Sequence, residues 1–173
     1  MGFEMTGQVK NLAKQFNPKA GSLLLRAHKQ WNDGKPRSAF RLILAAAKLG
    51  DPYGQQNLGY FYDVGIGVKP NRAAAMHWYM RAYRQGDCCS ANNIGTIYRD
   101  EGDSTRALEW FERAVDLGDT DANLEIAKIY IREKNQVVKA ARHLRRVIKA
   151  KAGMDVTIAS HEEAQRLLNK YSV

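Results

Sequence analysis

Apolar residues recur at helical spacing in two consecutive stretches near the middle of the chain. In the first stretch, Leu58, Phe61 and Tyr62 lie three and four residues apart, which places their side chains on one helical face. The second stretch has the same spacing, in Ala75, Trp78, Tyr79 and Ala82. The segment 63–71 between them contains two glycines and a proline, which indicate a turn. The pattern therefore predicts a helix hairpin within residues 51–87.

Residues that end and begin helices stand at the expected places around this turn. Gly65 can adopt the left-handed conformation that ends the first helix. Asn71, which follows a proline, can cap the second helix, and Gly86 can end it. These positions favour two helices over one long helix.

The hairpin pattern returns along the chain. The pair Trp110-Phe111 follows the pair Trp78-Tyr79 at an offset of 32 residues. In the first helix of the hairpin, Gly95 follows Gly59 at an offset of 36. Because glycine has no Cβ, we expect a neighbouring helix to approach closely at both positions. A period in the thirties indicates a helical solenoid, in which each helix pair is too small to bury its apolar face alone and stacks on the next.

This spacing divides the chain into repeats with a segment at each end. We expect an N-terminal helical arm over 1–20, repeats over 21–50, 51–87, 88–119 and 120–153, and a C-terminal capping helix within 154–173. The residues from Ser160 to Glu163 fit a capping box, which would open this last helix and let it run to about Tyr171. Its apolar residues would cover the open end of the stack.

The second repeat resembles the Sel1-like repeat, a long-looped relative of the tetratricopeptide repeat. The resemblance rests on these residues in order: Leu58-Gly59, Tyr62, Gly65, Gly67-Val68, Ala75, Trp78-Tyr79, Ala82 and Gly86. The shorter repeat 88–119 is closer to a tetratricopeptide repeat. The resemblance implies an all-α, right-handed α-solenoid of about four helix-turn-helix repeats. It also implies a non-catalytic role in protein binding.

The resemblance also suggests where a partner would bind. In these families the first helix of each repeat lines the concave face, and outward positions flanking the Leu-Gly pair touch the ligand. Transferred by register, the partner-binding residues are His28, Trp31, Tyr53, Gln56, Tyr60, Asn92, Arg99, Lys128 and Arg132. Aromatic, amide and basic groups together suit a peptide or helix of acidic character. An exposed Trp31 would be unusual on a surface without a binding task.

Charge is distributed unevenly. The net charge of +9 arises from +9 over residues 1–99, −7 over 100–126 and +7 over 127–173. Four basic residues fall on one face of the second helix of the last repeat, and they are Arg142, Arg145, Arg146 and Lys149. This basic patch is either a solvated face, a face paired with acidic residues of the preceding repeat, or a docking patch for an acidic partner. The acidic residues considered for such pairing are Glu109, Glu112 and Asp116.

The histidines and cysteines do not form a catalytic or metal-binding pattern in the sequence. The four histidines are scattered, without metal-ligand spacing to each other or to the cysteines. The adjacent Cys88 and Cys89 are interpreted as small helix-packing residues, although a thiolate at a helix start could be stabilised. We therefore expect no enzyme activity, no metal and no cofactor. Nucleic acid is disfavoured as a partner, because the acidic segment would interrupt a phosphate-binding track.

The hydropathy of the chain bears on where the protein is located. No run of about 18 apolar residues predicts a membrane span, and the first 19 residues lack the apolar core of a signal peptide. We expect a cytoplasmic adaptor, scaffold or regulator that binds a protein or peptide. A bacterial immunity protein that neutralises a toxin, an effector secreted without a signal, and an RNA-binding helical repeat remain alternatives. The oligomeric state is left open.

Overall fold

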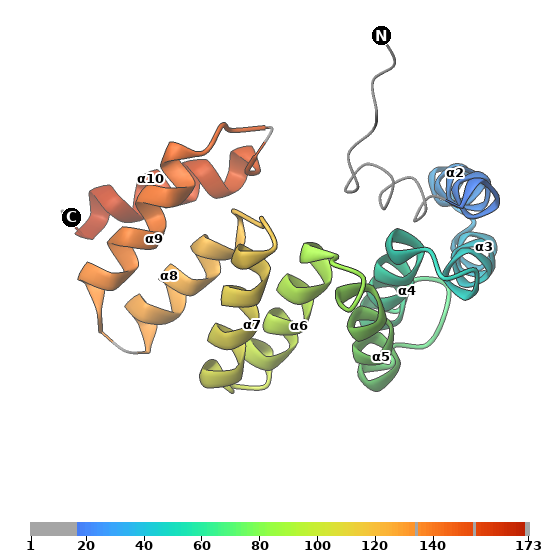
Figure 1. The fold of residues 1–173 in the computed structure, drawn as a ribbon, viewed down its shortest axis with the longest axis horizontal. Coiled ribbons are helices and arrows are strands. Elements are labelled where there is room, and N and C mark those ends of the chain that lie inside the picture. The colour runs from blue at the N-terminus through green and yellow to red at the C-terminus, as the bar shows by residue number, and fades with distance from the viewer. Residues whose placement is uncertain (1–16, 134, 154, 172–173) are drawn as a thin grey trace, which may run out of the picture. The chain divides into compact units, whose positions relative to one another are not determined.

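The computed structural model describes residues 17–133, 135–153 and 155–171. Within these ranges the regular structure is α-helical, apart from one isolated bridge between Ala152 and Val156. The helices are α2 (Pro18–Asn32), α3 (Pro36–Lys48), α4 (Pro52–Val64), α5 (Arg72–Tyr83), α6 (Cys88–Asp100), α7 (Ser104–Asp116), α8 (Ala122–Arg132), α9 (Val137–Lys149) and α10 (Ile158–Tyr171) (Figure 1). The predicted all-α class is confirmed. In this part of the chain no helix combines the length and the apolar character needed to cross a bilayer.

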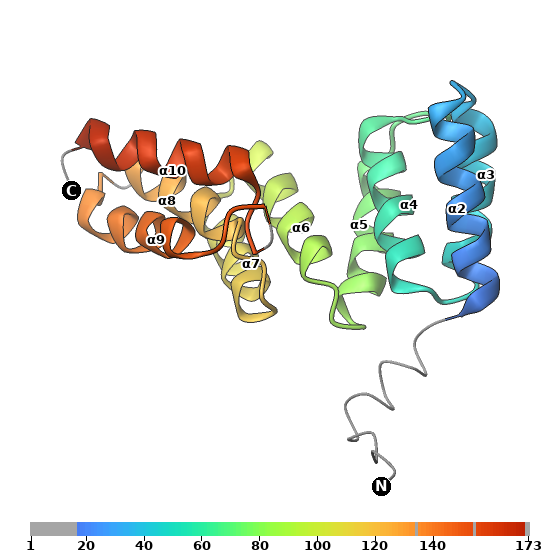
Figure 2. The same cartoon turned by 90° about the horizontal axis from the view of Figure 1, so that it is seen from above.

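The chain divides into two compact units, residues 1–87 and 88–173. In the first unit, α2 packs on α3, α3 on α4, and α4 on α5. In the second unit, each helix from α6 to α10 packs on the next in chain order (Figure 2). Packing between neighbours in sequence is the defining property of a solenoid.

The hairpin of α4 and α5 forms as the sequence predicts. Asp51 caps α4 by accepting a hydrogen bond from the backbone N–H of Gly54 at 2.7 Å. Gly65 ends α4 with φ of 84°, and Asn71 caps α5 by accepting from the N–H of Ala74 at 2.9 Å. Each cap satisfies a backbone group that the helix itself leaves unpaired.

The long loop between α4 and α5 packs back on the first repeat. Gly67, with φ of 69°, lies so close to α3 that a Cβ built on it would stand 2.3 Å from the carbonyl oxygen of Pro36. Ile66 beside it is buried in the core of the first unit, together with Ile43 and Phe61. The extra residues of this loop therefore join two repeats, whereas the sequence indicated only a turn.

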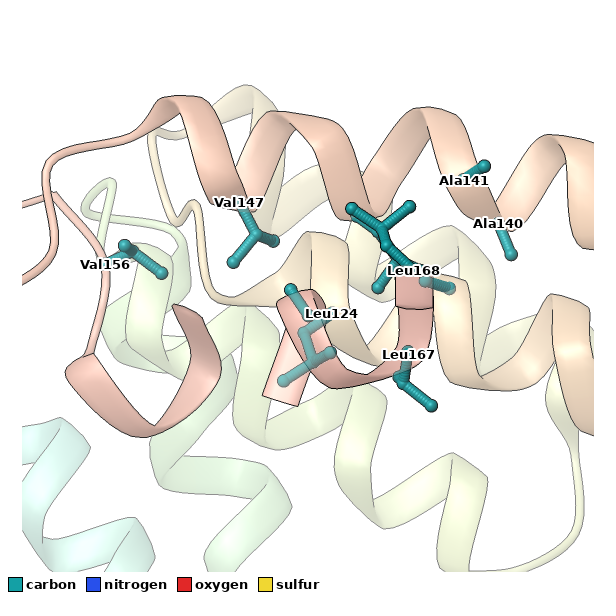
Figure 3. Close-up of a cluster of buried hydrophobic side chains, with 10 residues drawn as sticks. Leu124, Ala140, Ala141, Val147, Val156, Leu167 and Leu168 are labelled. Atoms are coloured by element: carbon teal, nitrogen blue, oxygen red, sulfur yellow. The ribbon is translucent and has the colours of Figure 1, made fainter. Parts of the chain in front are cut away.

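A cluster of buried apolar side chains in the second unit lies between α8, α9 and α10 (Figure 3). Leu124 comes from α8, Leu144 and Val147 come from α9, and Leu167 and Leu168 come from α10. The predicted cover of α10 over the preceding repeat is present, because the apolar residues of α10 are buried against this cluster. The helix ends at Tyr171, as expected.

The start of α10 differs from the prediction. The helix begins at Ile158, and Thr157 caps it by accepting from the N–H of Ser160 at 3.2 Å, so the capping box at Ser160 is wrong. Thr157 is held by Asp121 next to the start of α8, because its hydroxyl donates to the Asp121 carboxylate at 3.0 Å. This tie spans 36 residues, and local spacing could not indicate it.

The start of α2 also differs in detail. Asn17 caps the helix by accepting from the N–H groups of Lys19 and Ala20, and Pro18 occupies the first helical position. Proline favours this position because its missing N–H would be unpaired there in any case. The sequence predicted a helical arm that ends at residue 20 and a first repeat that begins at residue 21. Residues 18–20 belong to α2, and residues 1–16 of the expected arm lie outside the described residues.

Candidate functional site

A groove of about 360 Å³ lies on the first unit between residues of α2 and α4. Its floor is apolar and buried, formed by Ala27 of α2, Ile43 of α3 and Phe61 of α4. These residues are buried because the two repeats stack here, so the groove lies directly over the packed core. A partner entering the groove would meet an apolar surface.

Large aromatic side chains stand at the edges of this groove. Tyr53, Tyr60 and Trp31 remain 61%, 45% and 43% exposed, respectively. The Trp31 ring is fixed against the floor, with its centroid 5.5 Å from that of Phe61 and the planes tilted by 54°. Exposed aromatics around an apolar floor are the composition typical of the anchoring centre of a protein interface.

Four of the predicted partner-binding residues meet in this groove. They are His28, Trp31, Tyr53 and Tyr60, contributed by two helices. Gln56 is half-buried and does not line the groove.

The sequence did not single out three other lining residues, Asn32, Asn57 and Ile66. An isoleucine between two glycines in a long loop was the available signal for Ile66, because an apolar residue in a turn needs a packing partner.

The groove continues along α2 into a second hollow. Leu24, His28 and Tyr53 line both, and the second adds Leu25 and Arg26. Leu25 is 76% exposed, which extends the apolar surface outward. Among the described residues, neither lining includes a carboxylate, so the basic Arg26 sets the formal charge of the surface.

In the second unit, three more predicted residues meet in a polar pocket. Arg99 of α6 lies beside Lys128 and Arg132 of α8. Three acidic side chains line the same pocket, namely Asp100, Glu125 and Glu133. The basic residues were expected to hold an acidic ligand, but the structure places an equal number of carboxylates among them.

Ion pairs within this pocket neutralise most of its basic charge. Arg99 pairs closely with Glu125 and, at 2.9 Å, with Asp100. Lys128 pairs with the same Glu125 at 2.8 Å. The pocket therefore offers an acidic partner little uncompensated positive charge. Glu125 belongs to the repeat that follows the one containing Arg99.

Asn92 lines neither the α2–α4 groove nor the polar pocket of the second unit. It lies half-buried on α6, its side chain hydrogen-bonds the carboxylate of Asp119, and its Oδ1 is buried. The Asn92 side chain therefore contacts the turn before α8 and is not part of an open binding face.

The basic patch on α9 is exposed along one side of the helix. Arg142, Arg145, Arg146 and Lys149 lie opposite the buried Leu144 and Val147. Within residues 17–133, 135–153 and 155–171, none of the four forms an ion pair. The pairing with Glu109, Glu112 or Asp116 considered above is thus not formed in the described structure, and the patch keeps its full charge.

A family comparison matches the Sel1 repeat over residues 33–51, 52–87 and 93–119. The chain belongs to the Sel1 repeat family. Sel1 repeats form protein-interaction scaffolds, and proteins built from them are generally non-catalytic. The match ends at residue 119, although α8 and α9 form a further hairpin in this Sel1 repeat protein.

Solved structures share the fold of this Sel1 repeat protein. A Sel1 repeat protein from Oxalobacter formigenes superposes with a TM-score of 0.64 at 21% identity, over 94% of this chain and 78% of that one. A protective antigen of uropathogenic Escherichia coli with an SLR fold gives a TM-score of 0.67 at 18% identity, over 92% of this chain and 39% of that one. The Sel1-like α-solenoid predicted from the repeats is confirmed.

Relatives by sequence are considerably longer. A putative Sel1-like repeat-containing protein of Acanthamoeba polyphaga mimivirus is 26% identical over 91 residues, which cover 53% of this chain and 17% of the viral protein. The Sel1 repeat chain therefore spans about a sixth of the length of that relative.

Proposed function

We propose that this Sel1 repeat protein is a non-catalytic interaction module that binds a protein or peptide partner through the α2–α4 groove. The observation that carries the proposal is the meeting of Trp31, Tyr53 and Tyr60 around a buried apolar floor. These side chains are exposed at positions where the resemblance to Sel1-like repeats predicts ligand contacts. Covering them with a partner would remove apolar surface from water and so favour binding.

The shape of the groove suits one anchoring side chain and its neighbours. Its volume of about 360 Å³ lies near the lower end of the range of about 300–1,000 Å³ for ligand pockets. An aromatic or large aliphatic side chain of the partner would lie between Trp31 and Tyr60 on the Phe61 floor. The amide of Asn32 offers a hydrogen-bonding group at the edge.

The partner is proposed to carry acidic residues beside its apolar anchor. Support comes from Arg26, which lines the hollow next to the groove without a carboxylate among the described lining residues. Arg99 and Lys128 lend little support, because carboxylates already neutralise them. Charge complementarity of this kind raises the association rate and selects partners more than it adds affinity.

The test begins with the purified chain displayed against a random peptide library. Selected peptides should share an aromatic or large aliphatic residue next to acidic ones. Their affinities are then measured for Tyr53→Ala, Tyr60→Ala and Leu49→Ala. Leu49 is a matched control, because it is an exposed apolar residue of the same unit that does not line the groove.

We expect each tyrosine variant to bind about tenfold more weakly, the loss typical of an anchoring residue, with unchanged circular dichroism. Leu49→Ala should bind as the parent does. Equal affinity of the parent and a Tyr53→Ala/Tyr60→Ala double variant for every selected peptide would show that the partner binds elsewhere.

A further inference from the structure

Two sulfur atoms and a carboxylate oxygen converge in the second unit. Cys88 and Cys89 open α6, and Asp119 lies in the turn between α7 and α8. One ligand atom from each of the three residues lies within 4.8 Å of the other two. The chain has no other cysteines, and these two are not joined in a disulfide.

The stacking of consecutive hairpins produces this convergence. Asp119 is fixed by the start of α8, where its Oδ1 accepts a hydrogen bond from the N–H of Ala122 at 3.2 Å. Asn92, one turn after the cysteines on α6, hydrogen-bonds the same carboxylate. The carboxylate is therefore held toward α6 from both sides, as an outer-shell partner holds a metal-ligating carboxylate.

The electrostatics of Asp119 favour a cation beside it. Asp119 is half-buried, and Asp121 carries a second carboxylate two residues further along the chain. In the described structure, no lysine or arginine forms an ion pair with it. A half-buried carboxylate next to a second one is costly to charge, and a bound cation would offset that cost. The positive end of the α6 dipole also favours the thiolate form of cysteines at its start.

We propose that Cys88, Cys89 and Asp119 form a binding site for a thiophilic divalent cation, of which Zn²⁺ is the best match. Thiolate ligands favour zinc over calcium and magnesium, and cysteine sulfur and carboxylate oxygen are both ligands of zinc in proteins. A fourth position remains for water or for a side chain of a partner.

The movement of the ligand side chains that zinc binding requires is small. Tetrahedral bonds to zinc of about 2.3 Å for sulfur place two sulfur atoms about 3.8 Å apart. The observed limit of 4.8 Å leaves at most about 1 Å to close between the two sulfur atoms, a distance within the reach of side-chain rotation at the first turn of a helix. Because zinc binds the thiolate form of cysteine, the affinity should rise with pH.

This site was not expected from the sequence, because the three ligands do not follow a recognisable spacing. The cysteines are adjacent, whereas Asp119 comes 30 residues after Cys89. They were interpreted as helix-packing residues, yet Cys89 is exposed. The proposed site lies within the second unit and does not depend on the groove of the first.

The test uses the reduced, metal-free full chain and Co²⁺ as a spectroscopic probe for the zinc site. We expect a one-to-one complex with a thiolate-to-cobalt absorption band in the near ultraviolet, which Zn²⁺ then abolishes by displacement. Cys88→Ser and Cys89→Ser should each reduce the band and weaken binding at least tenfold. Zn²⁺ should also protect Cys89 from alkylation by iodoacetamide.

Asp119→Asn is the decisive variant, since asparagine caps a helix as well as aspartate does and so preserves the start of α8. We expect it to weaken Co²⁺ binding at least tenfold with an unchanged melting temperature. Asp116→Asn, an exposed change on α7, should have no effect. A thiolate band that persists at parental affinity in Asp119→Asn, or the absence of any thiolate band in the parent chain, would overturn the proposal.

Discussion

The ring of Tyr79 lies directly over Gly59, so that a Cβ built on this glycine would stand 2.5 Å from Cδ1 of the tyrosine. Phe111 has the same relation to Gly95 one repeat later, at 2.7 Å. Both rings are fully buried. The second helix of each hairpin thus fits against the first only because the glycine has no side chain, as the repeated glycines indicated.

We expect Gly59→Val and Gly95→Val each to lower the free energy of unfolding by about 1–3 kcal/mol, because a buried ring must move to admit the new side chain. Urea unfolding followed by circular dichroism measures the change. Ala73→Val is the control, since Ala73 is an exposed position of α5 where valine costs little more than its lower helix propensity. Equal losses at the glycines and at Ala73 would contradict the contact.

The hydroxyl of Tyr79 is buried without a hydrogen-bond partner among the described residues, and burial raises the pKa of this tyrosine far above its ordinary value. An unpaired buried hydroxyl is costly, so Tyr79→Phe should raise the free energy of unfolding by about 1 kcal/mol. Thermal and urea unfolding measure the gain. Tyr53→Phe, at an exposed tyrosine, should change nothing. A loss of stability in Tyr79→Phe would reveal a partner for the hydroxyl.

His143 should make the fold sensitive to mild acid. Burial, and then the charge of Arg146, lower its pKa, while its Nδ1 lies 3.0 Å from Oδ1 of Asn123. The unfolded chain protonates this histidine near pH 6.5, whereas the folded chain resists protonation. The stability that His143 contributes is therefore complete above about pH 6.5 and is lost as the pH falls through the folded pKa.

We expect the urea midpoint of the parent to fall between pH 7.5 and 5.5 by more than that of His143→Gln. Asp119 acts in the opposite direction, because its raised pKa means that the folded state takes up a proton more readily in acid. Both proteins share that effect, so the difference between them isolates His143. Identical pH profiles would show that His143 protonates equally in both states.

The like charges on α9 should cost stability. Arg142→Glu places an acidic residue three and four positions before Arg145 and Arg146, and we expect a gain of roughly 0.5 kcal/mol as repulsion becomes attraction. Arg142→Gln, which only removes charge, should gain about half as much. Both gains should shrink in high salt, because exposed charges are screened. A loss of stability in both variants would mean that a carboxylate pairs with Arg142.

Local patterns were sufficient to predict the hairpins. The spacing of Leu58, Phe61 and Tyr62, with Gly65 and Asn71 at the turn, depends on interactions within a few residues, which are visible in the sequence. The same holds for Gly59 and Gly95, whose recurrence at a fixed helical position indicated a close approach. The Ser160 capping box failed because Asp121, far away in the chain, holds Thr157 in the capping position.

Arrangements between repeats were decided by the tertiary structure. The sequence placed Arg99 and Lys128 on first helices, but only stacking shows that Glu125 lies between them and pairs with both. Likewise, the helical register selected Trp31 and Tyr60 separately, and packing brought them to one groove over Phe61. The sequence by itself determined the helices, the turn between α4 and α5 with its caps at Gly65 and Asn71, and the family, because these depend on short-range spacing. The structure decided which side chains are neighbours, because that depends on contacts between residues about thirty positions apart.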